Sequence, residues 1–203
     1  MASYLQVENV SKSYGPRVLF SNISFNINEG DKIALIAPNG TGKTSLLKIL
    51  AGVDSSDGDG KVKFLKDISI AFLSQENKYD NNLSVMDVVL PVAKNCREHE
   101  VKEILYSLNL TDIEKKMGEL SGGEIKRVAI ACMLAQKPEF LVMDEPTNHL
   151  DMDSIEYLED YLSKQRCTLL MVTHDRYFLD RVCNQILEMA DGTLYSYNGN
   201  YSY

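Results

Sequence analysis

The sequence lacks any apolar run near the length that a membrane-spanning helix requires. A helix needs about 20 consecutive apolar residues to cross a bilayer, and no stretch of this 203-residue chain approaches that length. The first ten residues, MASYLQVENV, also lack the basic and apolar segments of a secretory signal. We therefore expect no direct membrane insertion, and a role at a membrane would need a partner.

Cysteine is scarce, and basic residues form no cluster. The four cysteines lie far apart without a C-x-x-C pair, which is typical of reduced thiols in a cytoplasmic protein rather than of disulfides or a zinc site. Acidic residues outnumber basic ones by 29 to 21, which gives a net charge of −8. The general surface is therefore not expected to bind nucleic acid, and such a contact would have to be local.

Hydrophobic patterning predicts one α/β domain over residues 1–203 with a mainly parallel sheet at its core. Alternating polar and apolar residues predict a β subdomain of short antiparallel strands, at residues 4–7, 18–20 and 23–27. Continuous apolar runs predict buried parallel strands, at residues 33–36, 140–143 and 168–172. Helices are expected at 46–50 and 155–162, an inserted helical subdomain at about 84–119, and a hairpin at 185–197.

Residues 34–50, ALIAPNGTGKTSLLKIL, match the phosphate-loop pattern G-x-x-x-x-G-K-[ST], except that alanine stands at the first glycine position. A bound triphosphate needs converging backbone N–H groups, a cation and a hydroxyl for its Mg²⁺. We expect Lys43 to reach the β- and γ-phosphates and Thr44 to hold Mg²⁺. The expected ATP-binding residues of this loop are Asn39, Gly40, Thr41, Gly42, Lys43, Thr44 and Ser45.

The alanine, Ala37, precedes the phosphate cradle at the exit of the predicted strand, where a small side chain suffices. We therefore expect Ala37 at negative φ in a loop that closes normally. Gly40 and Gly42 lack a Cβ and can take positive φ, which lets the main chain curl close to an anion. The competing interpretation is a glycine-rich turn that contains lysine by chance.

Two carboxylates, Asp144 and Glu145, directly follow the apolar run at 140–143. Ligands of a parallel sheet bind at the carboxyl ends of its strands, which is also where the phosphate loop emerges. Asp144 suits Mg²⁺ coordination, and Glu145 is placed to polarise the water that attacks the γ-phosphate. The competing interpretation of this pair is a solvated acidic loop.

The stretch Leu120-Ser121-Gly122-Gly123-Glu124 resembles the signature motif of ATP-binding-cassette (ABC) ATPases, with glutamate where glutamine is usual. Other motifs of that family follow in the family's order. The resemblance implies adenine stacking by Tyr14, Mg²⁺ and γ-phosphate sensing by Gln75, a D-loop at Asp151 and a switch histidine at His174. Singly, each has an ordinary explanation in packing or helix capping, but their joint order identifies the chain as a member of the family.

The resemblance also implies how the signature motif acts. The motif lies at the start of a predicted helix, whose free amides and positive end suit an anion. In the family it faces away from its own phosphate loop and closes over ATP held by a second domain. Ser121, Gly122, Gly123 and Glu124 would thus act in trans, and we expect ATP-driven pairing of two cassettes with slow hydrolysis by a lone domain.

Three stretches resemble the ABC-F branch, which has no membrane part and acts on ribosomes: DEPTNHLD, THDRYFLDRV and YNGNYSY. The resemblance implies the N-terminal cassette of a two-cassette protein, with ribosome contacts mostly outside this stretch. The 44 residues at 76–119 leave little room for the arm that some members insert there. Two alternatives stay open: the ATPase subunit of a membrane transporter, and a nucleotide-gated interaction module with negligible turnover.

Overall fold

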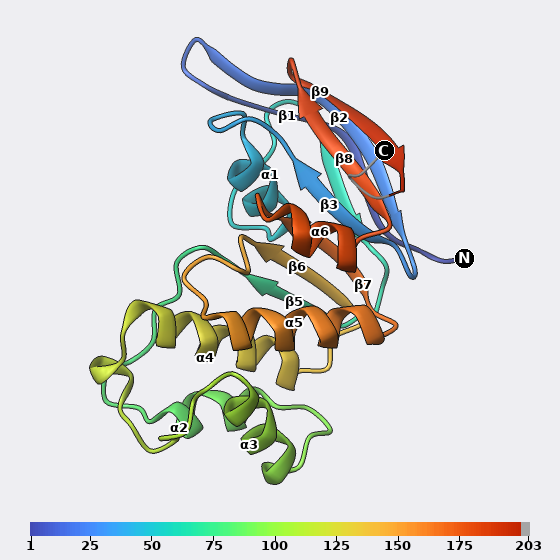
Figure 1. Ribbon diagram of the computed structural model, residues 1–203. Coiled ribbons are helices and arrows are strands. Elements are labelled where there is room, and N and C mark those ends of the chain that lie inside the picture. Colours follow the sequence, from blue (N-terminus) through green and yellow to red (C-terminus); the bar gives the residue numbers. More distant parts are fainter. Residues whose placement is uncertain (200–203) are drawn as a thin grey trace.

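Two β-sheets pack around a shared core in the computed structural model, which describes residues 1–199 (Figure 1). The smaller is antiparallel, in the order β2-β1-β4, and is formed by β1 (Ser3–Tyr14), β2 (Arg17–Asn28) and β4 (Lys61–Phe64). The larger has six strands in the order β5-β6-β7-β3-β8-β9, parallel except for β9. This mixed, mainly parallel architecture with an antiparallel β part is the predicted fold class.

The antiparallel part differs from the prediction in the length of its strands. Residues 18–20 and 23–27, expected as separate strands, form one strand of 12 residues, β2, and β1 is equally long. Pairing continues through several register shifts, and Asn9 and Asn22 take positive φ, which asparagine tolerates better than most residues. The expectation of short strands was wrong because bulges let pairing run on past polar positions.

The central strands of the larger sheet, β3 (Lys32–Ile36), β6 (Phe140–Asp144) and β7 (Thr168–Val172), are the three buried strands that the apolar runs predict. Their side chains alternate between two hydrophobic clusters, one on each face of the sheet. On β6, for example, Leu141 and Met143 face one cluster, and Phe140 and Val142 face the other. Burial on both faces explains why these runs are uninterruptedly apolar.

The remaining strands complete the sheet edges. β5 (Ile70–Leu73) lies at one edge, while β8 (Gln185–Ala190) and β9 (Thr193–Asn198) form the predicted hairpin at the other. Asp191 and Gly192 turn the hairpin with positive φ. Residues 200–203, which end the stretch YNGNYSY, lie outside the described residues.

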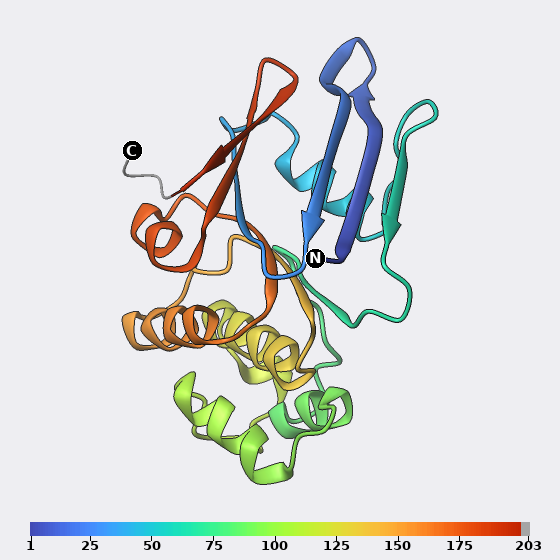
Figure 2. The same ribbon diagram turned by 90° about the vertical axis from the view of Figure 1, so that its right-hand side faces the viewer.

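Helices cover the sheet on both sides. α1 (Lys43–Leu50) packs between the two sheets, while α4 (Gly122–Ala135), α5 (Met152–Lys164) and α6 (Arg176–Val182) contribute to the other cluster. The segment expected as a helical subdomain holds α2 (Val85–Val89), α3 (Glu98–Ser107) and two 3-10 turns (Leu90–Val92 and Met117–Glu119). Figure 2 shows it at the end of the molecule opposite the β1–β2 hairpin. None of the helices within residues 1–199 has the length and apolar character to cross a membrane.

Candidate functional site

Four neighbouring parallel strands, β5, β6, β7 and β3, have their carboxyl ends side by side. The ends of these strands and the segments after them carry Gln75, the Asp144–Glu145 pair, His174 and the phosphate loop with Lys43. All five side chains line one cavity of about 340 Å³. The cavity is also lined by Tyr14, Asn39, Gly40, Gly42, Thr44 and Ser45. The topology therefore brings together the expected phosphate, metal and water-activating groups.

The phosphate loop is closed around its lysine. Ala37 is not among the described residues with positive φ, as expected, whereas Gly40 and Gly42 have φ of 76° and 98°. A Cβ on Gly42 would also stand 3.0 Å from the ring of Phe20, so glycine is required there. The Nζ of Lys43 folds back and donates to the Ala37 carbonyl at 2.7 Å. Because Gly42 has no side chain, α1 begins without a side-chain cap, which leaves its first amides available to an anion.

Asp144 gathers two further polar side chains around its carboxylate. Thr44 Oγ1 donates to one oxygen at 3.3 Å, and Gln75 Nε2 donates to the other at 3.4 Å. Burial raises the pKa of Asp144, against the hydrogen bond from Thr44, which lowers it. A carboxylate, a hydroxyl and a side-chain amide are oxygen groups of the kind that Mg²⁺ prefers, so this cluster fits that ion. No group of three or more His, Cys, Asp or Glu side chains suited to a metal occurs in residues 1–199.

Glu145 is buried and held in a backbone conformation that few residues adopt. Its φ is 48°, its amide donates to the Val172 carbonyl at 2.7 Å, and 5% of the residue is exposed. Burial raises the pKa of its carboxyl, which strengthens it as a base, while the neighbouring His174 lowers it. Glu145 Oε1 lies 3.3 Å from His174 Nε2, which in turn lies 3.2 Å from Lys43 Nζ. These three side chains form one chain of contacts across the cavity.

The structure adds two basic residues that the sequence interpretation missed. Arg17 lines the cavity and donates to the Gly40 carbonyl at 2.7 Å. Lys126, on α4, is buried and donates to the Glu145 carbonyl at 3.0 Å. Burial lowers the pKa of Lys126, and the carboxylates of Asp144 and Glu145 raise it. Lys126 could have been noticed because it falls on the apolar stripe of α4, in helical register with Ala129, Ile130 and Met133.

The signature residues lie apart from the phosphate cavity. Ser121 is exposed and caps α4 by accepting from the Glu124 amide at 3.2 Å, while Glu124 accepts from the Ser121 amide at 3.2 Å. Gly122 and Gly123 line a second cavity of about 780 Å³. Its wall also includes Gln75 and Glu145, so the two cavities share two residues.

Asp151 and Tyr14 complete the set of expected site residues. Asp151 caps α5 by accepting from the Ser154 amide, and it also accepts from Asn109 Nδ2 at 2.7 Å, so its carboxylate is engaged within the chain. It lines neither cavity as far as residues 1–199 define them. Tyr14 stands at the rim of the phosphate cavity with 55% of its surface exposed.

Comparison with known proteins gives a consistent result. Residues 20–148 match a family model described as ABC transporter. The chain is 39% identical over 240 aligned residues to an uncharacterized ABC transporter ATP-binding protein, YfmR, of Bacillus subtilis, covering 98% of this chain and 38% of that protein. It is 32% identical to ABC transporter F family member 5 of Arabidopsis thaliana, covering 99% of this chain and 30% of the relative. It is also 32% identical, over 243 aligned residues, to the energy-dependent translational throttle protein EttA of Mycobacterium tuberculosis, covering 100% of this chain and 43% of that protein.

The alignment lengths bear on how the relatives differ. Alignments of 240 and 243 residues exceed the 203 residues of this chain, so two of these relatives hold residues that it lacks. The chain spans well under half the length of each of the three relatives.

Solved structures share the fold. The dimeric structure of MJ0796, described as a bacterial ABC transporter cassette, has a TM-score of 0.80 and 27% identity, covering 96% of this chain and 98% of that one. A structure of the same cassette in a post-hydrolysis state bound to ADP and Pi has a TM-score of 0.77 and 26% identity, with the same coverage.

Proposed function

Because this chain belongs to the ABC family of ATP-binding cassettes, we propose that it binds Mg²⁺-ATP, hydrolyses it and pairs with a second cassette in doing so. We propose further that it serves an ABC-F protein that acts on ribosomes. The observation that carries the proposal of ATP binding and hydrolysis is the convergence of four strand ends on one cavity. The side chains proposed to bind phosphate, to hold Mg²⁺ and to act as the general base meet there from segments far apart in the sequence.

The phosphate end of the cavity would hold the nucleotide. The first amides of α1 and the ammonium of Lys43 supply the positive groups that a triphosphate needs. Lys43 would exchange its contact with the Ala37 carbonyl for the β- and γ-phosphates. Thr44, Gln75 and Asp144 would hold Mg²⁺, which stabilises negative charge on the phosphate oxygens. Tyr14 would stack on the base.

Glu145 would act as the general base for water attack on the γ-phosphate. It faces the cavity, and burial raises the pKa of its carboxyl. His174 Nε2 lies 3.3 Å from Glu145 Oε1 and 3.2 Å from Lys43 Nζ, where it can orient both the carboxylate and the γ-phosphate. A general base contributes about 10²–10⁴ to the rate, so Glu145→Gln should retain ATP and lose nearly all turnover.

The signature motif supports pairing with a second cassette. Ser121 is exposed, and a Cβ built on Gly122 meets no described atom within 4 Å. Nothing within residues 1–199 therefore requires glycine at this position, whereas a phosphate approaching the start of α4 would. The dimeric MJ0796 cassette gives the same fold in a paired form. The partner would be a second cassette of the same protein or another copy of this chain.

The ribosomal role is proposed from the relatives. One relative is named as a translational throttle protein and another as an F family member. The chain spans well under half of each, so the parts that contact a ribosome would lie mostly outside it. The four cysteines, free in the structure, agree with a cytoplasmic location. The alternative, an ATPase subunit of a membrane transporter, is supported by the description of MJ0796 as a transporter cassette.

One experiment separates the two roles. Glu145→Gln in the intact protein should trap the ATP-bound form, and we expect it to sediment with ribosomes only when ATP is present. Recovery of the trapped form in a membrane complex, and not with ribosomes, would favour the transporter. Wild-type turnover that is lost in both Glu145→Gln and Lys43→Ala would exclude a third role, a nucleotide-gated interaction module with negligible hydrolysis.

A further inference from the structure

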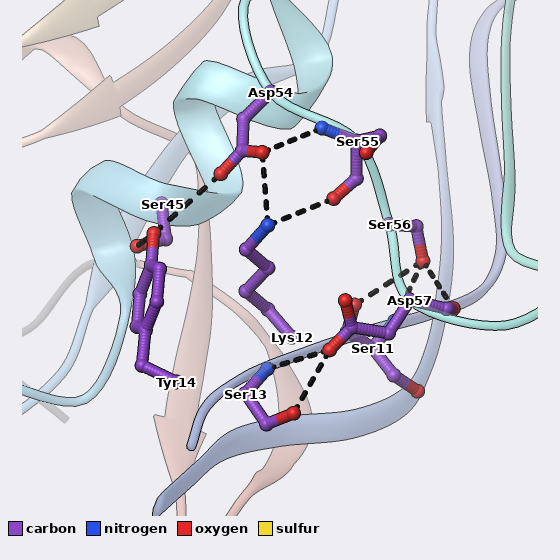
Figure 3. A network of polar contacts seen from close by, with 9 residues as sticks. All are labelled: Ser11, Lys12, Ser13, Tyr14, Ser45, Asp54, Ser55, Ser56 and Asp57. Carbon is purple, nitrogen blue, oxygen red and sulfur yellow. Dashed lines mark hydrogen bonds and ion pairs between the residues drawn. The ribbon is translucent and has the colours of Figure 1, made fainter.

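A network of polar contacts fastens the end of β1 to the loop that follows α1 (Figure 3). The Ser11 amide donates to Ser56 Oγ at 3.0 Å, and the Ser13 amide donates to Asp57 Oδ2 at 2.8 Å. This loop leaves the helix whose first turn forms the phosphate site. The strand that carries Tyr14 and the helix that follows the phosphate loop are thereby joined at a point away from that loop.

The centre of this network is an ion pair between Lys12 and Asp54. Lys12 Nζ donates to Asp54 Oδ1 at 2.8 Å and to the Ser55 carbonyl at 3.1 Å. Only 8% of Lys12 is exposed, and lysine is rarely buried to this degree unless it is paired. The hydrogen bond between the two raises the pKa of Lys12 and lowers the pKa of Asp54, so both stay charged at neutral pH.

The same pair contacts Tyr14 at two places. Lys12 Nζ lies over the aromatic ring, 5.4 Å from its centroid. The Tyr14 hydroxyl lies 3.5 Å from Asp54 Oδ2 and 3.5 Å from Ser45 Oγ, and Figure 3 shows it between these two residues. The ring is thus held by a cation over its face and by polar groups at its hydroxyl. More than half of the residue nevertheless stays exposed at the rim of the phosphate cavity.

We propose that Lys12 and Asp54 are positioning residues for the base: they fix the Tyr14 ring so that its exposed face receives the adenine of ATP. The inference rests on the proposed function, since it assumes a nucleotide in the cavity. An aromatic side chain that is already fixed loses less conformational freedom when a base stacks on it. Because neither residue lines the phosphate end of the cavity, the pair should act on the nucleoside and not on the triphosphate.

The alternative is that the pair only ties β1 to the loop after α1. In that case its removal would destabilise the fold and weaken the binding of every ligand of the cavity to the same extent. A ligand with phosphates but no nucleoside separates the two explanations. Inorganic tripolyphosphate, with Mg²⁺, can occupy the phosphate loop but has no base to stack on the Tyr14 ring.

The test is calorimetric titration of the wild-type chain and its variants with Mg²⁺-ATP and with Mg²⁺-tripolyphosphate. Loss of base stacking costs about 1–3 kcal/mol, so Tyr14→Ala should lower the affinity for ATP about 5- to 150-fold. Lys12→Met and Asp54→Asn should each lower the affinity for ATP about three- to tenfold. The double variant should be no weaker than either single variant, because the two residues act as one unit. None of the three substitutions should change tripolyphosphate affinity by more than about twofold.

Lys63→Met is the matched control, since Lys63 is an exposed lysine of the same antiparallel sheet, and it should leave both affinities unchanged. The inference would be overturned if Lys12→Met weakened the binding of both ligands equally, or if it left ATP affinity unchanged. If Lys12→Met does not fold, Asp54→Asn carries the same test, with the melting temperature as the check on folding. A wild-type chain that binds neither ligand would instead overturn the proposed function, and this inference with it.

Discussion

The ammonium of Lys126 donates to the backbone carbonyl of Glu145 at 3.0 Å and thereby links the signature helix to the proposed general base. Both residues are more than nine-tenths buried. Glu145 also needs support, because its φ of 48° is unfavourable for a residue with a side chain. The contact therefore stabilises the backbone turn that aims the carboxylate into the cavity.

Replacing Lys126 should slow hydrolysis without weakening nucleotide binding. A hydrogen bond from a charged donor contributes about 1.5–3 kcal/mol, so Lys126→Met should lower kcat about tenfold or more while ATP affinity stays within about twofold. The measurement is steady-state ATPase of the paired form beside ATP titration. Lys102→Met, at a partly exposed lysine of α3, is the control. An unchanged kcat, or a loss of ATP affinity equal to the loss of kcat, would refute the positioning role.

The adjacent glycines of the signature motif should respond differently to a methyl group. A Cβ on Gly123 would stand 2.9 Å from the His149 carbonyl, so Gly123→Ala should cost about 1–3 kcal/mol of stability. Gly122 has open space around it, so Gly122→Ala should keep the wild-type melting temperature. We expect Gly122→Ala to abolish ATP-dependent pairing all the same, because the methyl group would stand where the partner's nucleotide binds.

Thermal melts without nucleotide and light scattering with ATP, both in a Glu145→Gln background, give the two readouts for these glycines. If Gly122→Ala paired as well as its parent, the start of α4 would not be part of a composite nucleotide site. If it lost stability as Gly123→Ala does, its effect on pairing would have a simple structural cause.

Glu124→Gln, which installs the usual signature residue, should change stability only slightly and only above acidic pH. Burial raises the pKa of Glu124, but the hydrogen bond from Ser121 and the charge of Lys115 outweigh burial and lower it overall. A carboxyl whose pKa is lower in the folded state stabilises that state above its unfolded pKa, about 4.3, and loses this effect as the pH falls further. Glutamine keeps the capping box, and the ion pair with Lys115 is partly exposed, so we expect a loss of about 0.5 kcal/mol or less.

Melting temperatures of the parent and Glu124→Gln at pH 7 and pH 3 test this. The difference should be present at pH 7 and absent at pH 3. A larger difference at pH 3 would mean that the ion pair and the cap do not set the charge state of Glu124.

The site follows from sequence where its chemistry is local. The glycines of the phosphate loop, the carboxylates after a buried run and the order of the motifs are all visible in one dimension, because each depends on a strand or helix next to it. The convergence of four strand ends also follows, since parallel strands place their carboxyl ends at one edge.

Other features depend on contacts that sequence spacing does not encode. Positive φ at Asn9 and Asn22 lets two long strands pair through bulges, and a pattern of alternation reads those positions as breaks. The contacts of Arg17 with Gly40 and of Lys126 with Glu145 join segments 23 and 19 residues apart. The Lys12–Asp54 pair likewise spans 42 residues and depends on how the β1 strand meets the loop after α1.

The measurement that tests the account most directly is Mg²⁺-ATP binding to the wild-type chain, Lys43→Ala and Lys48→Ala. Both lysines belong to α1, but Lys43 is buried against the phosphate loop, and Lys48 is exposed and lies outside the phosphate cavity. We predict that the wild-type chain and Lys48→Ala bind ATP with equal affinity and that Lys43→Ala loses at least about 90% of it, as expected when a charged hydrogen bond to phosphate is removed. Equal binding by all three chains, or no binding by the wild type, would contradict a nucleotide site at the carboxyl ends of β5, β6, β7 and β3.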